Sequence, residues 1–414
     1  MTIESLVGDF PAAWTLTTLG EICQRGGGLI QTGPFGSQLH AADYVPVGIP
    51  SIMPQNIGDN RVVPDGIARI TAEDAKRLNR YLVRPGDIVY SRRGDVERRA
   101  LITENENGWL CGTGCLRVRF GNFEFVDPRY ASFYLGHFAV REWIVRHAIG
   151  ATMPNLNTSI LSALPVVLPP LIEQHAIADI LGSLDNKIEL NRRMNQTLEA
   201  LARSLFQSWF VENSGAENWG IGRLGDVVEI NKRSISRSYP HETIDYIDIS
   251  SVNTGRLEGI TTYDLQNVPS RAKRLVKHGD TIWSTVRPNR KSYLFISKPK
   301  ENLVVSTGFA VLTPTKIPPA YLYLWVTTDE FVDYLVANAD GSAYPAVLPE
   351  RFADAEMLLP PMDVLEKFEA VVGVMLAQIA HNEQQSHALA ALRDALLPRL
   401  MSGEVRVKDV EKEL

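Results

Sequence analysis

The sequence predicts an α+β protein in which two α/β domains are joined by two long helices. Residues 1–168 and 213–359 are rich in Gly, Pro and short β-branched stretches, which is typical of compact domains with short strands and turns. The segments that follow them carry apolar residues at helical spacing over many turns. A chain of 414 residues is long enough for two domains with hydrophobic cores.

A repeat with a constant offset of 191 residues relates the two halves of the chain. Upstream of it, Leu82-Val83-x-x-Gly86-Asp87 matches Leu275-Val276-x-x-Gly279-Asp280 at an offset of 193. The positions of the first half that recur 191 residues later are Tyr130, Gly150, Pro154, Pro169, Pro170, Ile188, Asn191, Leu198, Leu201 and Leu205. We therefore expect a pseudo-twofold internal repeat in which each half is a domain followed by a helix.

Proline pairs mark where each domain gives way to its helix. Pro169-Pro170 and Pro360-Pro361 precede the two helical patterns. The predicted segments are a first domain over 1–168, a central helix over 169–212, a second domain over 213–359, and a distal helix with a C-terminal tail over 360–414.

Shorter elements are predicted inside the domains. A helix is expected over 72–80, because Thr71 and Asp74 have the spacing of a capping box. Further helices are expected after Asp127-Pro128 and after Pro318-Pro319, since proline suits the first turn of a helix.

The two long segments have heptad seams, in which apolar residues alternate at spacings of four and three. The first seam is Ile177, Leu181, Leu184, Ile188, Asn191, Asn195, Leu198, Ala202, Leu205 and Trp209. The second is Phe368, Val372, Met375, Ile379, Asn382, Ser386, Leu389, Arg393, Leu396 and Leu400. Arg393 interrupts the second seam, and the neighbouring Leu392 can cover the gap.

An apolar seam needs a partner, and we predict that the two helices form an antiparallel coiled-coil pair. Polar residues lie near the middle of both seams, where they fix register at a cost in stability. The chain must build a whole domain between the helices, and pseudo-twofold symmetry then favours the antiparallel arrangement. The alternative is that each helix packs separately on its own domain. A helix of about 40 residues would span roughly 60 Å, which is more than one such domain requires.

Composition and motifs exclude several classes of protein. Cys23, Cys111 and Cys115 form neither a disulfide framework nor a zinc-site pattern, and no membrane span or signal peptide is visible, so we expect a cytoplasmic chain without a membrane partner. Motifs for nucleotide binding, zinc proteases and serine hydrolases are missing, and the histidines lack ligand spacing. We therefore predict no catalytic residues, no metal and no cofactor in this chain.

Clusters of basic and polar residues are the candidates for binding DNA. The net charge of −6 does not indicate a nucleic-acid partner, but local clustering matters more than the total. Both halves place such a cluster just after a Gly-Asp turn, and arginine and asparagine can read guanine and adenine. A glycine-rich turn is a further candidate, since glycines allow close backbone approach. The candidate residues are Gly33, Phe35, Gly36, Ser37, Gln38, Ser91, Arg92, Arg93, Arg98, Arg99, Ser284, Thr285, Arg287, Asn289, Arg290 and Lys291.

Over nearly its whole length the chain resembles the specificity subunits of type I restriction–modification systems. Gly33-Pro-Phe-Gly-Ser37 and Asp280-Thr-Ile-Trp-Ser-Thr-Val-Arg-Pro288 resemble stretches of that family's target recognition domains. Pro169-Pro-Leu-Ile-Glu-Gln174 resembles the start of its central spacer helix, and Leu396-Leu-Pro-Arg-Leu-Met-Ser-Gly-Glu404 the end of its distal one.

The resemblance implies two target recognition domains that each read one half of a bipartite, asymmetric DNA sequence. It implies that the helices set the gap between the half-sites. It also implies docking of methyltransferase subunits, two in number, which bind S-adenosylmethionine and methylate adenine, and of restriction subunits that translocate and cut.

Two other functions remain open at this stage. The chain could be a self-sufficient DNA methyltransferase or nuclease, which would act on DNA without partners. It could also be a protein–protein adaptor without a role on DNA, in which the helices bind proteins and the domains bind peptides.

Overall fold

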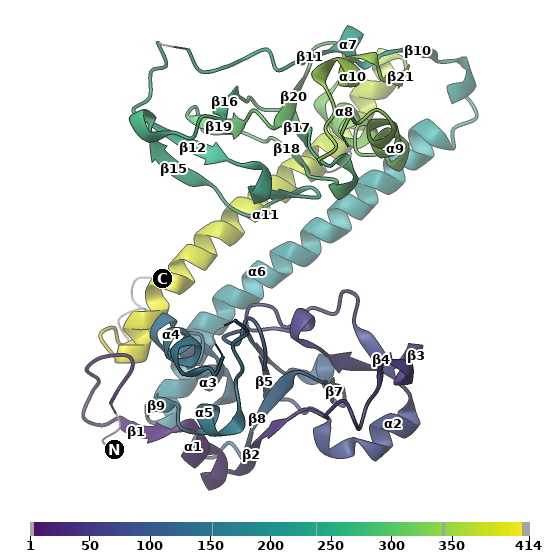
Figure 1. The fold of residues 1–414 in the computed structure, drawn as a ribbon. Helices are drawn as coiled ribbons and strands as arrows, with labels where there is room; N and C mark the ends of the chain where they lie inside the picture. Colours follow the sequence, from purple (N-terminus) through teal and green to yellow (C-terminus); the bar gives the residue numbers. More distant parts are fainter. Residues whose placement is uncertain (1–3, 151, 237, 342–343, 408–414) are drawn as a thin grey trace. The chain divides into compact units, whose positions relative to one another are not determined.

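The computed structural model describes residues 4–150, 152–236, 238–341 and 344–407, and the chain divides into two compact units. Unit 1 comprises Met1–Ile188 and His387–Leu414, and unit 2 comprises Glu189–Ser386. Each unit therefore contains one domain and a part of each long helix (Figure 1). The boundaries of the four predicted segments stay predictions.

The domain of unit 1 is built on a four-stranded antiparallel sheet in the order β2-β8-β5-β6. A second sheet has the order β4-β3-β7, in which β3 and β7 are parallel, and β1 pairs with β9. The strands are β1 (Thr15–Thr18), β2 (Gly27–Thr32), β3 (Tyr44–Ile52), β4 (Ala68–Ile70), β5 (Ile88–Ser91), β6 (Arg99–Leu101), β7 (Leu110–Cys111), β8 (Cys115–Gly121) and β9 (Pro165–Leu168).

The domain of unit 2 repeats this arrangement, with a fourth strand in the second sheet and an additional hairpin formed by β13 and β14. Its antiparallel sheet has the order β11-β20-β17-β18, its second sheet the order β15-β12-β19-β16 with β12 and β19 parallel, and β10 pairs with β21. The strands are β10 (Gly220–Arg223), β11 (Val228–Ile230), β12 (Thr243–Ile247), β13 (Val252–Asn253), β14 (Arg256–Leu257), β15 (Thr261–Asp264), β16 (Ala272–Leu275), β17 (Thr281–Ser284), β18 (Tyr293–Phe295), β19 (Leu303–Ser306), β20 (Phe309–Pro314) and β21 (Glu356–Leu359).

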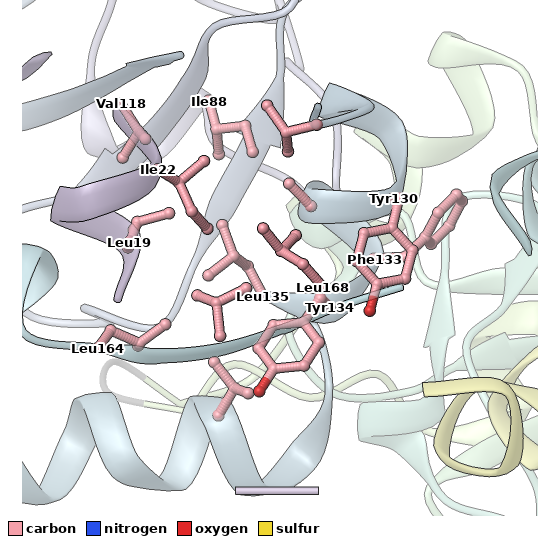
Figure 2. Packing of buried hydrophobic residues seen from close by; sticks show 14 of the residues in the cluster. Leu19, Ile22, Ile88, Val118, Tyr130, Phe133, Tyr134, Leu135, Leu164 and Leu168 are labelled. Atoms are coloured by element: carbon pink, nitrogen blue, oxygen red, sulfur yellow. The ribbon is translucent and has the colours of Figure 1, made fainter. Parts of the chain in front are cut away.

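Short helices pack on the sheets of each domain. In unit 1, leucine and isoleucine side chains of α1 and tyrosines of α3 pack against Ile88 of β5 and Val118 of β8 (Figure 2). The short helices of unit 1 are α1 (Leu19–Arg25), α2 (Ala72–Arg77), α3 (Pro128–Tyr134), α4 (Phe138–His147) and α5 (Thr158–Ser162). Those of unit 2 are α7 (Leu224–Val227), α8 (Pro319–Trp325), α9 (Asp329–Ala337) and α10 (Pro349–Asp354).

The helices expected from capping signals are present. Thr71 accepts a hydrogen bond from the backbone N–H of Asp74 at the start of α2, and Asp127 caps α3 in the same way. α2 ends three residues before the predicted end at 80, where a short 3₁₀ turn over Asn79–Tyr81 takes over.

The long helices are α6 (Leu171–Phe206), which is followed by a π-helical turn over Gln207–Val211, and α11 (Met362–Ser402). Among the described residues, no helix has the length and apolar character needed to cross a membrane. Every residue of the two predicted seams is buried or half-buried, as the burial along α6 and α11 shows.

The parts of α6 and α11 in unit 2 pack antiparallel around a layer of asparagines. The Asn191 Nδ2 donates to Gln385 Oε1 at 2.9 Å and to Ser386 Oγ at 3.2 Å. One turn further along α6, Asn195 Oδ1 accepts from Asn382 Nδ2 at 2.8 Å. Rising numbers in one helix therefore meet falling numbers in the other, and the predicted antiparallel pair is confirmed.

The parts of the same helices in unit 1 are held by an ion pair and an apolar cluster. Arg393 of α11 binds Asp185 of α6 at 2.7 Å. Leu400 and Met401 lie in the same buried cluster as Ile177 of α6. Arg393, which breaks the second seam, thus finds a carboxylate partner on the facing helix.

Candidate nucleic-acid interface

A tight turn follows β5 in unit 1 and β17 in unit 2, and a buried serine shapes both turns. The Ser91 hydroxyl donates to the carbonyl of Arg93 at 2.8 Å, and the Ser284 hydroxyl donates to the carbonyl of Val286 at 2.9 Å. Both serines are about 1% exposed, so they fix the backbone of the basic turn and do not reach its surface. We therefore exclude Ser91 and Ser284 from the DNA-contacting surface that the sequence predicted.

A second loop, which starts at Gly150 in unit 1 and at Gly341 in unit 2, recurs beside each basic turn. The two glycines have φ of 110° and 97°, a backbone conformation that side chains rarely adopt. At the base of the first loop, paired backbone hydrogen bonds of 3.0 and 2.9 Å join Ile149 and Asn155. The corresponding bonds between Asp340 and Ala346 are both 2.9 Å, so the two loops close in the same way.

Backbone hydrogen bonds attach each loop to the neighbouring basic turn. In unit 1 the Leu156 N–H donates to the carbonyl of Arg92 at 2.9 Å. The equivalent bond in unit 2 runs from the Val347 N–H to the carbonyl of Thr285 at 2.8 Å, and the Arg287 N–H there also donates to the carbonyl of Pro345 at 2.7 Å. The repeated Gly-x-x-x-Pro sequence and the basic turn therefore form one surface in each domain, which we call the paired-loop surface.

The glycine-rich turn of unit 1 joins the same surface. A side chain at Gly33 would meet the carbonyl oxygen of Gly112 at 2.1 Å, so only glycine fits there. The turn presents Phe35, whose ring is 53% exposed, and the Arg92 guanidinium lies 5.8 Å from the ring centre. This geometry places an aromatic face beside a cation at the surface.

The basic turn of unit 2 holds its charged groups differently. The Arg287 guanidinium lies 4.6 Å from the centre of the Tyr344 ring. Asn289 and Arg290 are exposed, whereas the Lys291 ammonium binds Asp329 of α9 at 2.6 Å. This hydrogen bond raises the pKa of Lys291 and lowers that of Asp329, so both stay charged near neutral pH.

Arg99 lies inside the domain and not on the paired-loop surface. Its side chain is 6% exposed, and its Nε donates to the carbonyl of Ser132 at 2.7 Å. Burial lowers the pKa of Arg99. The neighbouring Arg98 is exposed and lies 3.3 Å from Asp95. Because successive strand residues face opposite sides, one arginine of this pair is structural and only the other remains a candidate.

The remaining candidates are thereby sorted by position. Gly33 is buried and serves the turn, and the Thr285 hydroxyl donates to the carbonyl of Gly308 at 2.9 Å. The candidates with at least part of their surface open to solvent are Phe35, Gly36, Ser37, Gln38, Arg92, Arg93, Arg98, Thr285, Arg287, Asn289, Arg290 and Lys291.

Within the described ranges, no three His, Cys, Asp or Glu side chains are grouped so that they could hold a metal ion. Burial raises the pKa of the Cys111 thiol to about 12, so the thiolate that metal binding or nucleophilic attack requires is not populated near neutral pH. Cys115, which donates its S–H to the carbonyl of Ile52, has its pKa raised for the same reason.

The sequence alone did not assign the loop residues Met153 and Tyr344 to this surface. Both precede the repeated proline, and their side chains are 62% and 70% exposed. The repeated Gly-x-x-x-Pro spacing was the available signal, but nothing in the sequence brought it next to the basic turns.

Comparison with known proteins matches both halves of the chain to the same family. The model of the type I restriction modification DNA specificity domain matches residues 11–200 and again residues 216–368. Each match covers one domain and the first part of the long helix that follows that domain. The match is thus duplicated in the same way as the fold.

Curated relatives and a solved structure agree with this match. The MjaIX specificity subunit of Methanocaldococcus jannaschii is 21% identical over 438 aligned residues, which cover 98% of this chain and 97% of the relative. The HindI specificity subunit of Haemophilus influenzae is 24% identical over 184 residues, covering 43% of this chain and 40% of the relative. The crystal structure of a type I restriction-modification S subunit from M. genitalium superposes with a TM-score of 0.57 at 15% identity, covering 95% of this chain and 96% of that one, which establishes the shared fold.

Proposed function

Because the chain belongs to the type I restriction modification DNA specificity family, we propose that it is the noncatalytic subunit that recognises DNA for a type I complex. As a member of that family it is a specificity subunit with two target recognition domains. In our proposal each domain reads one half of a bipartite, asymmetric DNA target. The two helices set the gap between the half-sites.

The paired-loop surface is the observation that carries the proposal. Both domains attach a repeated loop to a basic turn through equivalent backbone hydrogen bonds. The side chains on these equivalent frames differ, because Arg92 and Arg93 of unit 1 correspond to Thr285 and Val286 of unit 2. An arginine that contacts guanine reads the base sequence, whereas one that contacts phosphate does not. Different side chains on equivalent backbones therefore suit two half-sites of different sequence.

Partner subunits would supply the chemistry. We propose that two methyltransferase subunits dock on this chain, bind S-adenosylmethionine and methylate adenine, and that restriction subunits join the complex. The name of the MjaIX relative, a specificity subunit of a restriction enzyme, supports this division of labour. The acidic composition of the helical segments also suits protein docking better than DNA binding.

Methylation mapping tests the proposal directly. In cells that express this chain with its methyltransferase subunits, single-molecule sequencing should find methyladenine at a split, asymmetric motif. A strain that lacks this chain but keeps the methyltransferase subunits is the control and should lose the methylation. Active methyltransferase subunits without any such motif would contradict the proposal.

The length of the helices tests their role as a spacer. One heptad inserted into α6 within 184–198, with a matching heptad in the facing part of α11, lengthens the pair by about 10 Å, close to three base pairs of DNA. The half-sites should stay the same while the gap grows. A five-residue insertion in both helices is the control, because it turns each seam by about 140° beyond a whole turn, away from its partner, and should abolish assembly. An unchanged gap in an active heptad variant would refute the spacer role.

Two alternatives make opposite predictions. A self-sufficient enzyme would cut DNA with Mg²⁺, or methylate it with S-adenosylmethionine, as the purified chain alone. A protein adaptor would retain DNA in the assembled complex unchanged after Arg93→Ala and Arg290→Ala. Our proposal predicts a loss of about 1–3 kcal/mol for each arginine that contacts a base, and no loss for the exposed Arg146→Ala on α4.

A further inference from the structure

An exposed apolar side chain stands at the same place on the paired-loop surface of each domain. Met153 is 62% exposed in unit 1, and Tyr344, which is 191 residues later, is 70% exposed in unit 2. Each lies directly before the proline of the repeated loop. The two domains have different residues at this position, but both side chains are large and mainly apolar.

Backbone hydrogen bonds join the two ends of each loop, on either side of these side chains. The loops close through two hydrogen bonds each, between Ile149 and Asn155 and between Asp340 and Ala346. Proline at the next position restricts the backbone of Met153 and Tyr344 to extended conformations. A large side chain presented by such a frame loses little further backbone entropy when it meets a partner.

The cation beside each surface identifies the kind of partner. In unit 2 the Arg287 guanidinium stacks on Tyr344 at 4.6 Å, and in unit 1 Arg92 lies 5.8 Å from Phe35. The two aromatic rings come from different loops, since Phe35 belongs to the glycine-rich turn and Tyr344 to the repeated loop. Both domains therefore place an exposed aromatic ring beside an arginine, but they use residues that are not equivalent in the repeat. This favours the view that the ligand requires such a pair in both domains, and that the pair is not simply a packing contact inherited from the repeat.

We propose that Met153 and Tyr344 contact bases in the DNA half-sites of unit 1 and unit 2. This inference rests on the proposed DNA-recognition function. Each apolar side chain packs on a base face or a thymine methyl group, while an arginine of the same paired-loop surface, Arg92 in unit 1 and Arg287 in unit 2, contacts phosphate or guanine. DNA offers both an anionic backbone and apolar base surfaces within reach of one such pair, whereas a purely anionic ligand would leave the exposed apolar surface unused.

The test uses the complex of this chain with its methyltransferase subunits and duplexes that carry the mapped methylation motif. Affinity is measured for Tyr344→Ala, Tyr344→Phe and Met153→Ala on the motif and on duplexes with each base pair replaced in turn. Val336→Ala on α9 and Phe138→Ala on α4 are matched controls, because their apolar side chains are 45% and 68% exposed and belong to helices and not to the paired loops.

Tyr344→Ala should weaken binding by about 5- to 100-fold and relax base preference in one half-site only. Tyr344→Phe keeps the ring face and should bind close to the unchanged complex. Met153→Ala should relax preference in the other half-site, and both controls should behave as the unchanged complex. A merely structural role would lower affinity without changing base preference.

The outcomes separate failure of this inference from failure of the proposed function. If the unchanged complex shows no preference for any motif, the proposed function fails. If the unchanged complex is specific and Tyr344→Ala and Met153→Ala keep the full base-preference profile, the inference is overturned while the proposed function stands. A loss of base preference that the two controls share equally also overturns it.

Discussion

The two domains fill the same place in their central sheets with different chemistry. In unit 1, Arg99 of β6 lies opposite Tyr90 of β5, and both are buried. In unit 2, the equivalent cross-strand pair is Tyr293 and Trp283, with ring centres 5.5 Å apart. The backbone register is the same, but a hydrogen-bonded cation in one domain is replaced by an aromatic pair in the other.

The neighbouring helix has changed together with this pair. The carbonyl of Ser132 on α3 accepts a hydrogen bond from Arg99 in unit 1. Its counterpart in unit 2, 191 residues later, is Tyr323, whose ring packs edge-on against Tyr293 at 6.0 Å. The repeated frame therefore tolerates a complete change of interior chemistry, provided that facing residues change together.

Each domain also contacts the long helices through an arginine, again in its own way. In unit 1, Arg393 of α11 binds Asp185 and lies 3.5 Å from Asp59 of the domain. In unit 2, Arg203 of α6 donates to the Tyr293 hydroxyl at 2.9 Å. The two arginines are not equivalent in the repeat, since Arg393 corresponds to Ala202 and Arg203 corresponds to Asp394, so each domain has its own contact with the helices.

The largest predicted effect is the loss of the buried cation. Arg99→Ala leaves the Ser132 carbonyl without its hydrogen-bond donor and opens a cavity where the buried side chain was, so unit 1 should lose about 3–5 kcal/mol of stability. Hydrogen–deuterium exchange resolved by peptide measures this, since amides of β5 and β8 should exchange faster. Those of β17 and β20 in unit 2 serve as an internal reference.

Arg98→Ala is the matched control for this change. Arg98 is exposed and only pairs with Asp95 at 3.3 Å, so its loss should change the stability of unit 1 by less than about 0.5 kcal/mol. Equal exchange in the Arg99→Ala and Arg98→Ala proteins would show that the buried cation does not stabilise unit 1.

Arg99 also shows where sequence reasoning stops. The repeat, the heptads and the proline boundaries predicted the two domains and the antiparallel helices, because these depend on periodicity along the chain. Two adjacent arginines at the start of a strand do not show in the sequence which side chain faces the interior of the domain and which faces solvent. Arg98 and Arg99 look alike in the sequence, and only the start of β6 at Arg99 decides which one is buried.

The asparagine layer belongs to the frame that both halves share, since Asn191 and Asn382 are equivalent in the repeat. Asn382→Leu leaves the Asn195 Oδ1 without its donor at 2.8 Å, and should cost unit 2 about 2–3 kcal/mol. Asn195→Leu together with Asn382→Leu should recover part of this loss, because both partners are then apolar. Thermal unfolding of the two single variants and the double variant gives the coupling energy. Additive losses would mean that the two amides act independently.

The two long helices carry opposite charges at one pair of equivalent positions in the repeat. Arg192 of α6 corresponds to Glu383 of α11, and burial raises the pKa of Glu383 to about 7, with Glu199 and Glu258 adding to the shift. A carboxyl with a raised pKa binds its proton more tightly in the folded state than in the unfolded chain. Its contribution is therefore complete below the usual pKa of 4.5 and is lost as the pH rises towards 7.

Glu383→Gln isolates this contribution. Relative to the variant, the unchanged protein should lose about 3 kcal/mol of unit 2 stability between pH 4.5 and pH 8, because the variant keeps a neutral group throughout. Denaturant unfolding at a series of pH values measures the difference. The exposed Glu366→Gln on the same helix is the control and should show a flat difference. If the stability difference between the unchanged protein and Glu383→Gln also did not change with pH, the Glu383 carboxylate would be exposed to solvent and not buried.

The candidate site could be predicted only in part, for a related reason. The basic turns follow a repeated Gly-Asp signal, so their positions were visible in the sequence. Tyr344 was missed because its neighbour Arg287 is more than fifty residues away in the chain, and backbone hydrogen bonds such as that from Arg287 to Pro345 bring the two segments together. Long-range strand-like pairing of this kind has no local sequence signature.

The smallest predicted effect tests the shared frame itself. Tyr130 of α3 donates its hydroxyl hydrogen to the carbonyl of Val167 at 2.8 Å, and Tyr321 of α8 donates to the carbonyl of Leu358 at 2.7 Å. Both bonds hold a helix to the last strand of its domain, and both rings are fully buried. Tyr130→Phe and Tyr321→Phe each remove one neutral hydrogen bond without opening a cavity, so each should cost about 1 kcal/mol in its own unit. Exchange of the amides in β9 and β21 measures the two losses in parallel, and each variant is the control for the other.

If the interiors of the two domains diverged while their backbone arrangement stayed equivalent, the two losses should agree within about 0.5 kcal/mol. A much larger loss in one unit would mean that the interior chemistry, and not the frame, decides how firmly α3 or α8 is held.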